Sequence, residues 1–309
     1  MPDEVAVVIP NYNGASFIGA CLDALLRQER PPDDVLVVDN GSTDGSAAML
    51  RERYPAVRVE ALPTNLGFAG GVNHGIRTTS APLVAVLNSD AIVDRRWLAE
   101  LLAAPRPDDV WAWGSVLVAE ETGRIESAGD QCSPLGLAYK HLRDRPLEEL
   151  PSEPFEVFAP PGAAPLLRRS VFDELGGYAD HFFMYYEDVD LAFRARLRGY
   201  RALLVPSARV RHALGKSGTA AMVRYHVARN STWCAVRNLP EVGPGIVWGG
   251  IRRGMRDARK RGYVGPFLKG KAAALVALPS VLRQRRAIQA TRTVDADAIA
   301  AMFGDPHTR

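Results

Sequence analysis

Two adjacent carboxylates, Glu187 and Asp188, are the residues in this sequence best suited to act as a general base. They lie in the stretch YEDVD of residues 186–190, where a helix is expected to begin, because apolar residues then recur near helical spacing as far as Gly199. Carboxylates in a first helical turn can also bond free N–H groups and offset the helix dipole. Base chemistry and helix capping both remain open from these residues alone.

Polar residues follow four apolar strand candidates. The candidates alternate with helical patterns and span Val5–Pro10, Val35–Asp39, Val57–Leu62 and Leu83–Asn88. This alternation predicts an α/β fold with a mostly parallel sheet flanked by helices, in which ligands bind at the carboxyl ends of the strands. Four polar clusters should therefore meet on one rim: Asn11 to Asn13, Asp39 to Ser42, Asn65, and Asn88 to Asp90.

The turn that begins at Asp39 could hold a nucleoside. An Asp at the end of a strand can accept a hydrogen bond from a pyrimidine edge, and the hydroxyl groups that follow can hold a ribose. A tight structural turn explains the same residues. The glycine-rich segment Asn65–Asn73 resembles a phosphate loop but lacks both GxGxxG and the P-loop signature, and close helix–sheet packing explains its glycines equally well.

Asp90 is the candidate metal ligand. With Asn88 it offers a carboxylate and an amide at alternate positions after an apolar strand. Magnesium or manganese often takes only one or two ligands from the protein when substrate phosphates supply the others. His212, beyond the strand candidate Arg201–Val205, could complete the site. A loop-forming pair and a hydrogen-bonded structural histidine are the respective alternatives.

The composition is that of a globular protein, with 309 residues of which 47% are hydrophobic and 24% charged. The three widely spaced cysteines suggest neither a disulfide framework nor a cysteine-ligated zinc site. No basic leader with a long apolar stretch opens the chain, and no 18 apolar residues run without interruption. We therefore expect a cytoplasmic protein that does not span a membrane.

The distribution of charge divides the chain into two regions. Residues 252–286 hold 11 Lys and Arg against one acid, whereas the other residues carry a net charge of −7. We expect a catalytic domain over residues 1–220, with a nucleotide-sugar half to about residue 115, and an acceptor and base half over 116–220 in which residues 134–161 are loop-like. Residues 221–309 are expected to be helical and basic and to lie on the anionic inner face of the cell membrane as a peripheral region. A solvated charged helix is the alternative, and no zinc-finger or RNA-binding signature points to nucleic acid.

Taken in order, these motifs resemble a known enzyme family. VVIPNYNG, VVDNGSTDGS, NLGFAGGVNHG, LNSD, GGYADHFFMYYEDVDLAFRARLRGY and a following His are similar to the family 2 inverting glycosyltransferases of the GT-A fold, over about residues 4–215. Among these enzymes the pattern looks most like bacterial rhamnosyltransferases and related cell-surface polysaccharide enzymes. The resemblance implies transfer of a sugar from dTDP-rhamnose, or from a UDP-sugar, to a cell-envelope glycan or polyprenyl-linked acceptor.

Carried over position by position, the resemblance assigns a site. It implies that Asp188 is the base, that Glu187 orients the acceptor or the base, and that Asp90 binds Mg²⁺ or Mn²⁺ with His212 completing the metal site. The residues expected to bind the nucleotide-sugar are Pro10, Asn11, Asn13, Asp39, Asn65, Asn88 and Asp90. Asn88 stands where the family's DxD motif has its first acid, a departure that lowers the expected affinity for the cation.

Three other functions fit parts of the pattern. A nucleotidyltransferase would need basic residues after the first strand, and Asn11–Ser16 contains no Lys or Arg. A nicotinamide dehydrogenase would need GxGxxG at the same place. A catalytically silent sugar-nucleotide-binding protein fits the residues as well, and product release from a dTDP- or UDP-sugar would separate it from an enzyme.

Overall fold

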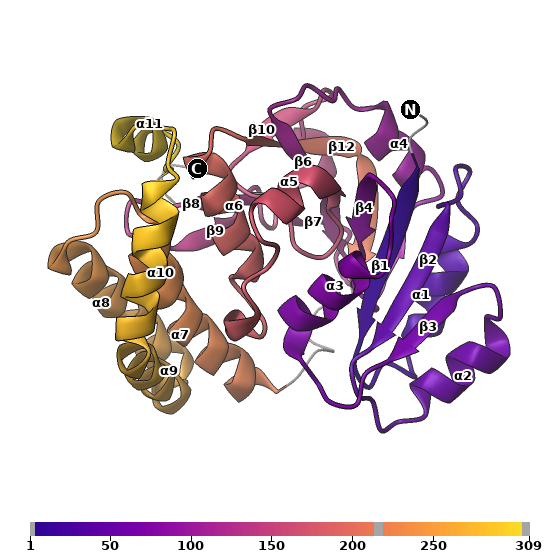
Figure 1. Ribbon diagram of the computed structural model, residues 1–309, viewed down its shortest axis with the longest axis horizontal. Coiled ribbons are helices and arrows are strands. Elements are labelled where there is room, and N and C mark those ends of the chain that lie inside the picture. Colours follow the sequence, from indigo (N-terminus) through magenta and orange to yellow (C-terminus); the bar gives the residue numbers. More distant parts are fainter. Residues whose placement is uncertain (1–3, 213–218, 305–309) are drawn as a thin grey trace.

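The first half of the central sheet is parallel, as the alternating sequence pattern predicts. The computed structural model describes residues 4–212 and 219–304. The parallel strands stand in the order β3 (Arg58–Ala61), β2 (Asp34–Asp39), β1 (Val5–Asn11) and β4 (Leu83–Val86). Both faces of these strands are covered by helices, which are α1 (Ile18–Leu25), α2 (Ser46–Arg53) and α3 (Gly67–Arg77) (Figure 1).

The second half of the sheet mixes parallel and antiparallel strands. Strand β11 (Leu166–Arg168) is antiparallel to both β4 and β6 (Val110–Ala119), and β6 runs parallel to β12 (Arg201–His212). Strand β12 continues beyond Val205, where the predicted strand ends, through a register shift. It then pairs with β5 (Ala91–Val93) in the antiparallel sense. This continuation brings His212 beside the residues that follow β4.

Short strands form the wall of the second half. Strand β7 (Ile125–Ser127) pairs with β6, and β8 (Asp130–Cys132) pairs with β9 (Ala138–Lys140) as a separate hairpin. Strand β10 (Phe155–Val157) pairs with β12 at the edge of the main sheet. Residues 134–161, expected to be loop-like, thus contain two strands of three residues each. Helices α4 (Trp97–Ala103) and α5 (Arg169–Glu174) complete this half.

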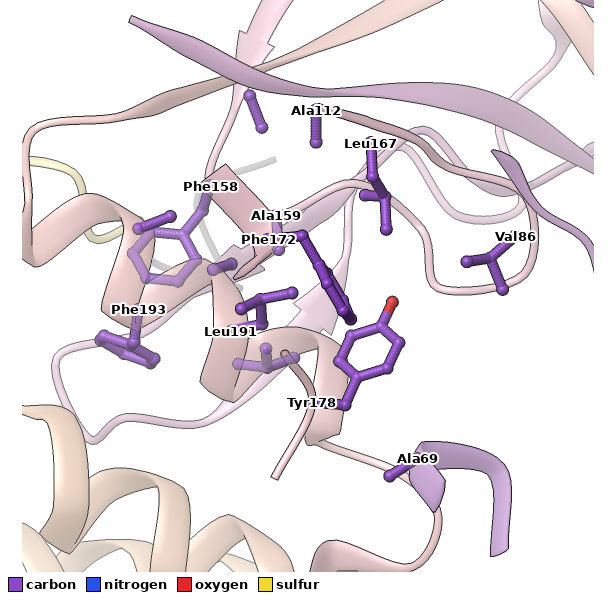
Figure 2. Close-up of a cluster of buried hydrophobic side chains, with 14 of the residues drawn as sticks. Ala69, Val86, Ala112, Phe158, Ala159, Leu167, Phe172, Tyr178, Leu191 and Phe193 are labelled. Atoms are coloured by element: carbon purple, nitrogen blue, oxygen red, sulfur yellow. The ribbon is translucent and has the colours of Figure 1, made fainter. Parts of the chain in front are cut away.

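Two apolar clusters pack against opposite faces of the sheet. Along β1, Val7 and Ile9 join the cluster that contains α1, whereas Val8 joins the cluster that contains α3. A strand buried on both faces reads as an uninterrupted apolar run, which is why β1 is easy to predict. Figure 2 shows part of the second cluster, where the rings of Phe158 and Phe193 meet edge to face with centroids 4.7 Å apart.

Glycines allow α3 to approach the sheet closely. A Cβ atom added at Gly75 would lie 2.4 Å from a methyl carbon of Val8, and one at Gly71 would lie 3.1 Å from the amide nitrogen of Asn40. The glycine-rich segment is therefore explained by helix–sheet contact. That contact places the N-terminus of α3 at the rim formed by the strand ends.

The C-terminal helices share a core with the sheet domain. They are α7 (Ala220–Asn238), α8 (Pro244–Arg261), α9 (Val264–Val276), α10 (Leu278–Ala290) and α11 (Ala296–Ala301). Trp233 and Cys234 of α7 belong to the same buried cluster as Phe182 and Phe193. Within residues 4–212 and 219–304, no helix combines the length and apolar character needed to cross a bilayer.

A buried ionic joint connects α7 to α6 (Glu187–Leu197). The fully buried carboxylate of Asp190 accepts hydrogen bonds from Arg194 Nε at 2.9 Å and Asn238 Nδ2 at 2.7 Å, and Arg237 Nη1 lies 3.2 Å away. Burial by itself would raise the pKa of Asp190, but the two guanidinium groups and the amide hold it below its ordinary value. Asp190 is therefore ionised and structural.

We predict that Asp190→Asn destabilises the protein at neutral pH. Breaking one side of a buried ion pair typically costs about 3–5 kcal/mol, because the opposite charges stay buried. A carboxyl whose pKa is lower in the folded state contributes stability above its ordinary pKa of about 4, and this contribution is lost as the pH falls. The difference in unfolding free energy between wild type and variant should therefore shrink in acid.

Urea denaturation at a series of pH values measures this effect, with Asp173→Asn as the control for an exposed carboxylate on α5. Equal loss of stability in the two variants would show that the joint contributes nothing.

Candidate active site

A cavity of about 360 Å³ lies where the strand ends, the β8–β9 hairpin and the start of α6 meet. It is lined by residues that the sequence predicts for catalysis and metal binding, together with two acids that it does not predict. The predicted residues are Asn88, Asp90, Glu187, Asp188 and His212. The additional acids are Glu126 of β7 and Asp130 of β8.

The carboxyl group of Asp188 faces the cavity from the first turn of α6. Its Oδ1 accepts a hydrogen bond of 2.8 Å from the backbone N–H of Val189, and a Cβ atom at Gly162 would lie 2.5 Å from its Oδ2. Burial raises the pKa of Asp188 above its ordinary value, despite these backbone bonds. Asp188 thus bonds the helix terminus and also lines the cavity, so capping and proton transfer are compatible in one residue.

Glu187 is more deeply buried than its neighbour. Its side chain is 5% exposed, and its Oε2 has no hydrogen-bond partner among the residues that the structure describes. Burial and the adjacent charge of Asp188 raise the pKa of Glu187 well above its ordinary range. A raised pKa favours the protonated carboxyl group, which can donate a hydrogen bond as well as accept one.

The turn before α6 has an unusual backbone. Phe183, Tyr185 and Tyr186 adopt positive φ angles of 66°, 65° and 72°, a region that side chains other than glycine seldom occupy. Each such residue costs roughly 1–3 kcal/mol and persists only when the surrounding structure holds it. Met184, Tyr185 and Tyr186 line the cavity, so the strained turn forms part of its wall.

Asp90 and His212 lie side by side in the lining of the cavity. His212 Nε2 lies 3.3 Å from Asp90 Oδ1 and 3.4 Å from the amide nitrogen of Asn88. The pairing of β12 with β5 sets His212 opposite Ala91, which explains how residues so distant in sequence meet. Sequence reasoning anticipated these two residues but not the strand pairing that joins them.

Glu126 lies beside Asp90 and His212 and was not predicted from the sequence. Its carboxylate lies 2.9 Å from His212 Nδ1 and forms an ion pair with Lys140 of β9. Burial would raise the pKa of Glu126, but the His212 hydrogen bond and the charge of Lys140 hold it below its ordinary value. Burial would likewise lower the pKa of His212, yet its bonds to Asp90 and Glu126 raise that pKa to about 9.

The residues around His212 fit a divalent cation. Metal-bound histidine usually donates its second ring N–H to a carboxylate, which is the arrangement that Glu126 and His212 make. Asn88 Oδ1 is buried without a hydrogen-bond partner in the described part of the chain, so it is available as an oxygen ligand. Within that part, no three His, Cys, Asp or Glu side chains form a ready metal cage. A bound cation would therefore need ligands from the substrate.

Asp130 lies in the cavity wall on β8. Burial, followed by the charge of Asp188, raises the pKa of Asp130 to about 8. Sequence reasoning had no signal for Asp130, because a strand of three residues is too short to show a period. The acids near Asp188 therefore have raised pKa values, whereas those around His212 form ion pairs.

Five of the seven residues predicted to bind the nucleotide-sugar lie outside this cavity, whereas Asn88 and Asp90 line it. Asn11 donates to Asp39 Oδ1 and to Ser46 Oγ, both at 3.0 Å, and the N–H of Ser42 donates to Asp39 Oδ2 at 3.2 Å. Asp39 is only 2% exposed and holds this turn together. The carboxylate of Asp39 therefore has a structural role, whether or not it also bonds the pyrimidine ring of a nucleotide.

The remaining nucleotide candidates lie close to this turn. Asn13 Oδ1 accepts from the N–H of Thr43 at 2.8 Å, and Asn65 Oδ1 accepts from the N–H of Gly67 at 2.8 Å. Pro10 lies beside Gly71 of α3. Considering the described residues alone, none of these five candidates, Pro10, Asn11, Asn13, Asp39 and Asn65, lines the cavity that contains Asp188.

Similarity to known proteins agrees with this architecture. The profile described as Glycosyl transferase family 2 matches residues 6–176, so it ends before Glu187 and His212. The chain is 27% identical over 266 residues to an N-acetylglucosaminyl-diphospho-decaprenol L-rhamnosyltransferase of Mycobacterium tuberculosis, covering 73% of this chain and 82% of that protein. It is 26% identical to the O-antigen chain rhamnosyltransferase RfbN of Salmonella typhimurium, covering 72% of this chain and 70% of the relative.

A solved structure shares the fold. The mannosyltransferase PcManGT from Pyrobaculum calidifontis, in complex with GDP-Man and Mn²⁺, superposes with a TM-score of 0.55 at 21% identity, covering 96% of this chain and 78% of the other. The sheet with helices on both faces and the family match over more than half of the chain together show that this protein belongs to glycosyl transferase family 2 and has the GT-A fold.

Proposed function

We propose that this glycosyltransferase moves rhamnose from dTDP-rhamnose, or a sugar from a UDP-sugar, to a hydroxyl group of a lipid-linked or polysaccharide acceptor of the cell envelope, with inversion. The observation that carries the proposal is the carboxyl group of Asp188, with its raised pKa, in the same cavity as the Asp90–His212 pair. The names of the two rhamnosyltransferase relatives support rhamnose as the first choice of sugar.

Asp188 would act as the general base. It would take the proton from the acceptor hydroxyl as that oxygen attacks the anomeric carbon and the bond to the diphosphate breaks. Attack from the face opposite the diphosphate inverts the anomeric carbon. Glu187, as a neutral acid, would donate a hydrogen bond that orients the acceptor or Asp188 itself.

Asp90, His212 and the oxygen of Asn88 would hold Mg²⁺ or Mn²⁺ together with the donor diphosphate. The cation, when bound, offsets the charge that develops on the leaving diphosphate. Glu126 would keep His212 oriented with Nε2 toward that position. The network around Asp39, with Pro10, Asn11, Asn13 and Asn65 on the same rim, would receive the nucleoside.

The C-terminal helices would attach the enzyme to an anionic membrane surface over residues 243–290. Their exposed apolar residues are Trp248, Leu268, Leu275, Val276 and Leu282, of which Val276 is the most exposed at 84%. All of them except Trp248 lie within the basic segment 252–286. Ile246 and Val247, which the sequence also offers to a membrane, instead pack against the core, so α9 and α10 present the larger apolar surface.

Transfer and its dependence on the base form the first test. With Mn²⁺ and a short-chain N-acetylglucosaminyl-diphospho-prenol as acceptor, the wild type should transfer rhamnose from dTDP-rhamnose, and UDP-sugars are assayed in parallel. Asp188→Asn should lower turnover by about 10²–10⁴-fold, because general-base catalysis contributes that much, with unchanged nucleotide affinity.

Glu187→Gln is the matched control and should lose less activity, because an amide can still donate and accept hydrogen bonds. Turnover of Asp188→Asn above about a tenth of wild type, well short of the range for a general base, would assign the base to another residue. Absence of transfer from every donor would favour a silent nucleotide-binding protein.

The residue that holds the metal and the residue that bonds the nucleobase should affect nucleotide binding in different ways. Asp90→Ala should abolish the gain in dTDP or UDP affinity that Mn²⁺ provides, because this side chain meets the diphosphate only through the cation. Asp39→Ala should weaken nucleotide binding with or without Mn²⁺. Isothermal titration with and without Mn²⁺ measures both effects, and an unchanged Mn²⁺ dependence in Asp90→Ala would remove both Asp90 and His212 from the metal site.

Membrane attachment should depend on the basic charge of residues 252–286 and on exposed apolar side chains such as Leu275 and Val276. The wild type should float with anionic vesicles at low salt and dissociate as salt is added, because each basic residue near such a surface contributes about 1 kcal/mol. Leu275→Ser combined with Val276→Ser should weaken flotation, whereas Leu26→Ser, at an exposed leucine after α1, should not. Equal flotation with neutral and anionic vesicles would contradict the proposal.

A further inference from the structure

One buried amide on α7 holds the strained turn that leads into α6. Asn230 is fully buried, and its Nδ2 donates to three backbone carbonyl groups of that turn. The distances are 3.0 Å to Phe182 O, 2.8 Å to Met184 O and 2.7 Å to Tyr185 O. The two hydrogens of this amide are thus shared among three carbonyls that no regular helix or strand would direct toward one point.

The orientation of this amide is determined by its neighbour. Arg229 Nε lies 2.8 Å from Asn230 Oδ1, and a guanidinium group can only donate hydrogen bonds. The oxygen of Asn230 must therefore face Arg229, which leaves the NH₂ group for the turn. Arg229 also donates through Nη2 to Phe182 O at 2.8 Å, so two consecutive residues of α7 bond the same segment.

The turn is held from its other side by α3. The N–H of Ala69 donates to Phe183 O at 3.2 Å, and a Cβ atom at Gly67 would lie 2.3 Å from that oxygen. The ring of Phe183 stacks on His226 of α7, with centroids 5.4 Å apart. The turn is therefore wedged between the C-terminal helices and the helix that begins at the nucleotide rim.

Loss of the amide has a definite physical consequence. The carbonyl groups of Met184 and Tyr185 would lose this donor, which is costly for backbone groups shielded from water, whereas Phe182 O would keep its bonds from Arg229 Nη2 and from the N–H of Met184. The positive φ angles of Tyr185 and Tyr186 direct the chain into α6, two residues before Asp188. Relaxation of the turn would consequently move the first turn of α6 relative to the cavity.

We propose that Asn230 is a positioning residue for sugar transfer, which holds the turn of residues 182–186 so that Asp188 faces the cavity. The proposal rests on Asp188 as the base. It gives the C-terminal helices a part in catalysis that involves no contact with substrate.

The test compares Asn230→Ala and Asn230→Ser with Asn238→Ala. Asn238 is an equally buried asparagine on the same helix, but it bonds Asp190 and Cys234 O instead of the turn. Three quantities are measured on the full chain: kcat for rhamnose transfer to the prenol acceptor per folded molecule, the Kd of dTDP with Mn²⁺, and hydrogen exchange of amides 182–188.

Asn230→Ala should lower kcat by about 10–100-fold, because misplacement of a reacting group by about 1 Å can cost 10²-fold. The Kd for dTDP should change by less than about twofold, since the turn is expected to bear on proton transfer and not on nucleotide affinity. Exchange of amides 182–188 should quicken. Asn230→Ser, which keeps one donor, should fall between wild type and the alanine variant. Asn238→Ala should lower the melting temperature without this change in exchange and with kcat near wild type.

Equal effects of Asn230→Ala and Asn238→Ala on kcat and on exchange would overturn the proposal, as would unchanged exchange in the turn. If Asn230→Ala does not fold, Asn230→Ser decides by the same criteria. A wrong base assignment appears in a different measurement, as turnover retained by Asp188→Asn.

Discussion

The burial of three carboxyl groups within four residues, at the start of α6, is the constraint on which the site depends. Burying a charged carboxylate is costly unless an opposite charge or hydrogen-bond donors accompany it. Asp190 has Arg194 and Arg237 beside it and is ionised. Glu187 and Asp188 lie in the cavity with raised pKa values. One short segment therefore supplies both an ionised anchor, Asp190, and two carboxyl groups with raised pKa values, because their environments differ.

The same physics divides the cavity into two sides. Around His212, the carboxylates of Glu126 and Asp90 form ion pairs with Lys140 and with His212 itself. Around Asp188, burial dominates and Asp130 has a pKa of about 8. Lys140 of the β8–β9 hairpin acts on both groups, because its charge pairs with Glu126 and also opposes the rise in the pKa values of Asp130 and Asp188.

The sequence predicts the parts of this arrangement that follow local rules. Apolar runs identify the strands, so Asn11, Asp39 and Asn88 could be placed at strand ends from the sequence. Helical periodicity likewise locates the carboxylates of α6. Glu126 and Asp130 could not be predicted, because they lie in strands of three residues, which are too short to show a period in the sequence. The role of Asn230 could not be predicted either, since the sequence of a helix does not reveal which loop a polar side chain bonds.

The buried joint between α6 and α7 also bears on how such enzymes can diversify. Asp190 lies in α6, two residues after Asp188, and Arg237 and Asn238 lie in the C-terminal helix α7. A recombination event that exchanged the C-terminal helices between relatives would separate a charge from its counter-charge in the core. The helices could therefore be exchanged only for others that carry counterparts of Arg237 and Asn238.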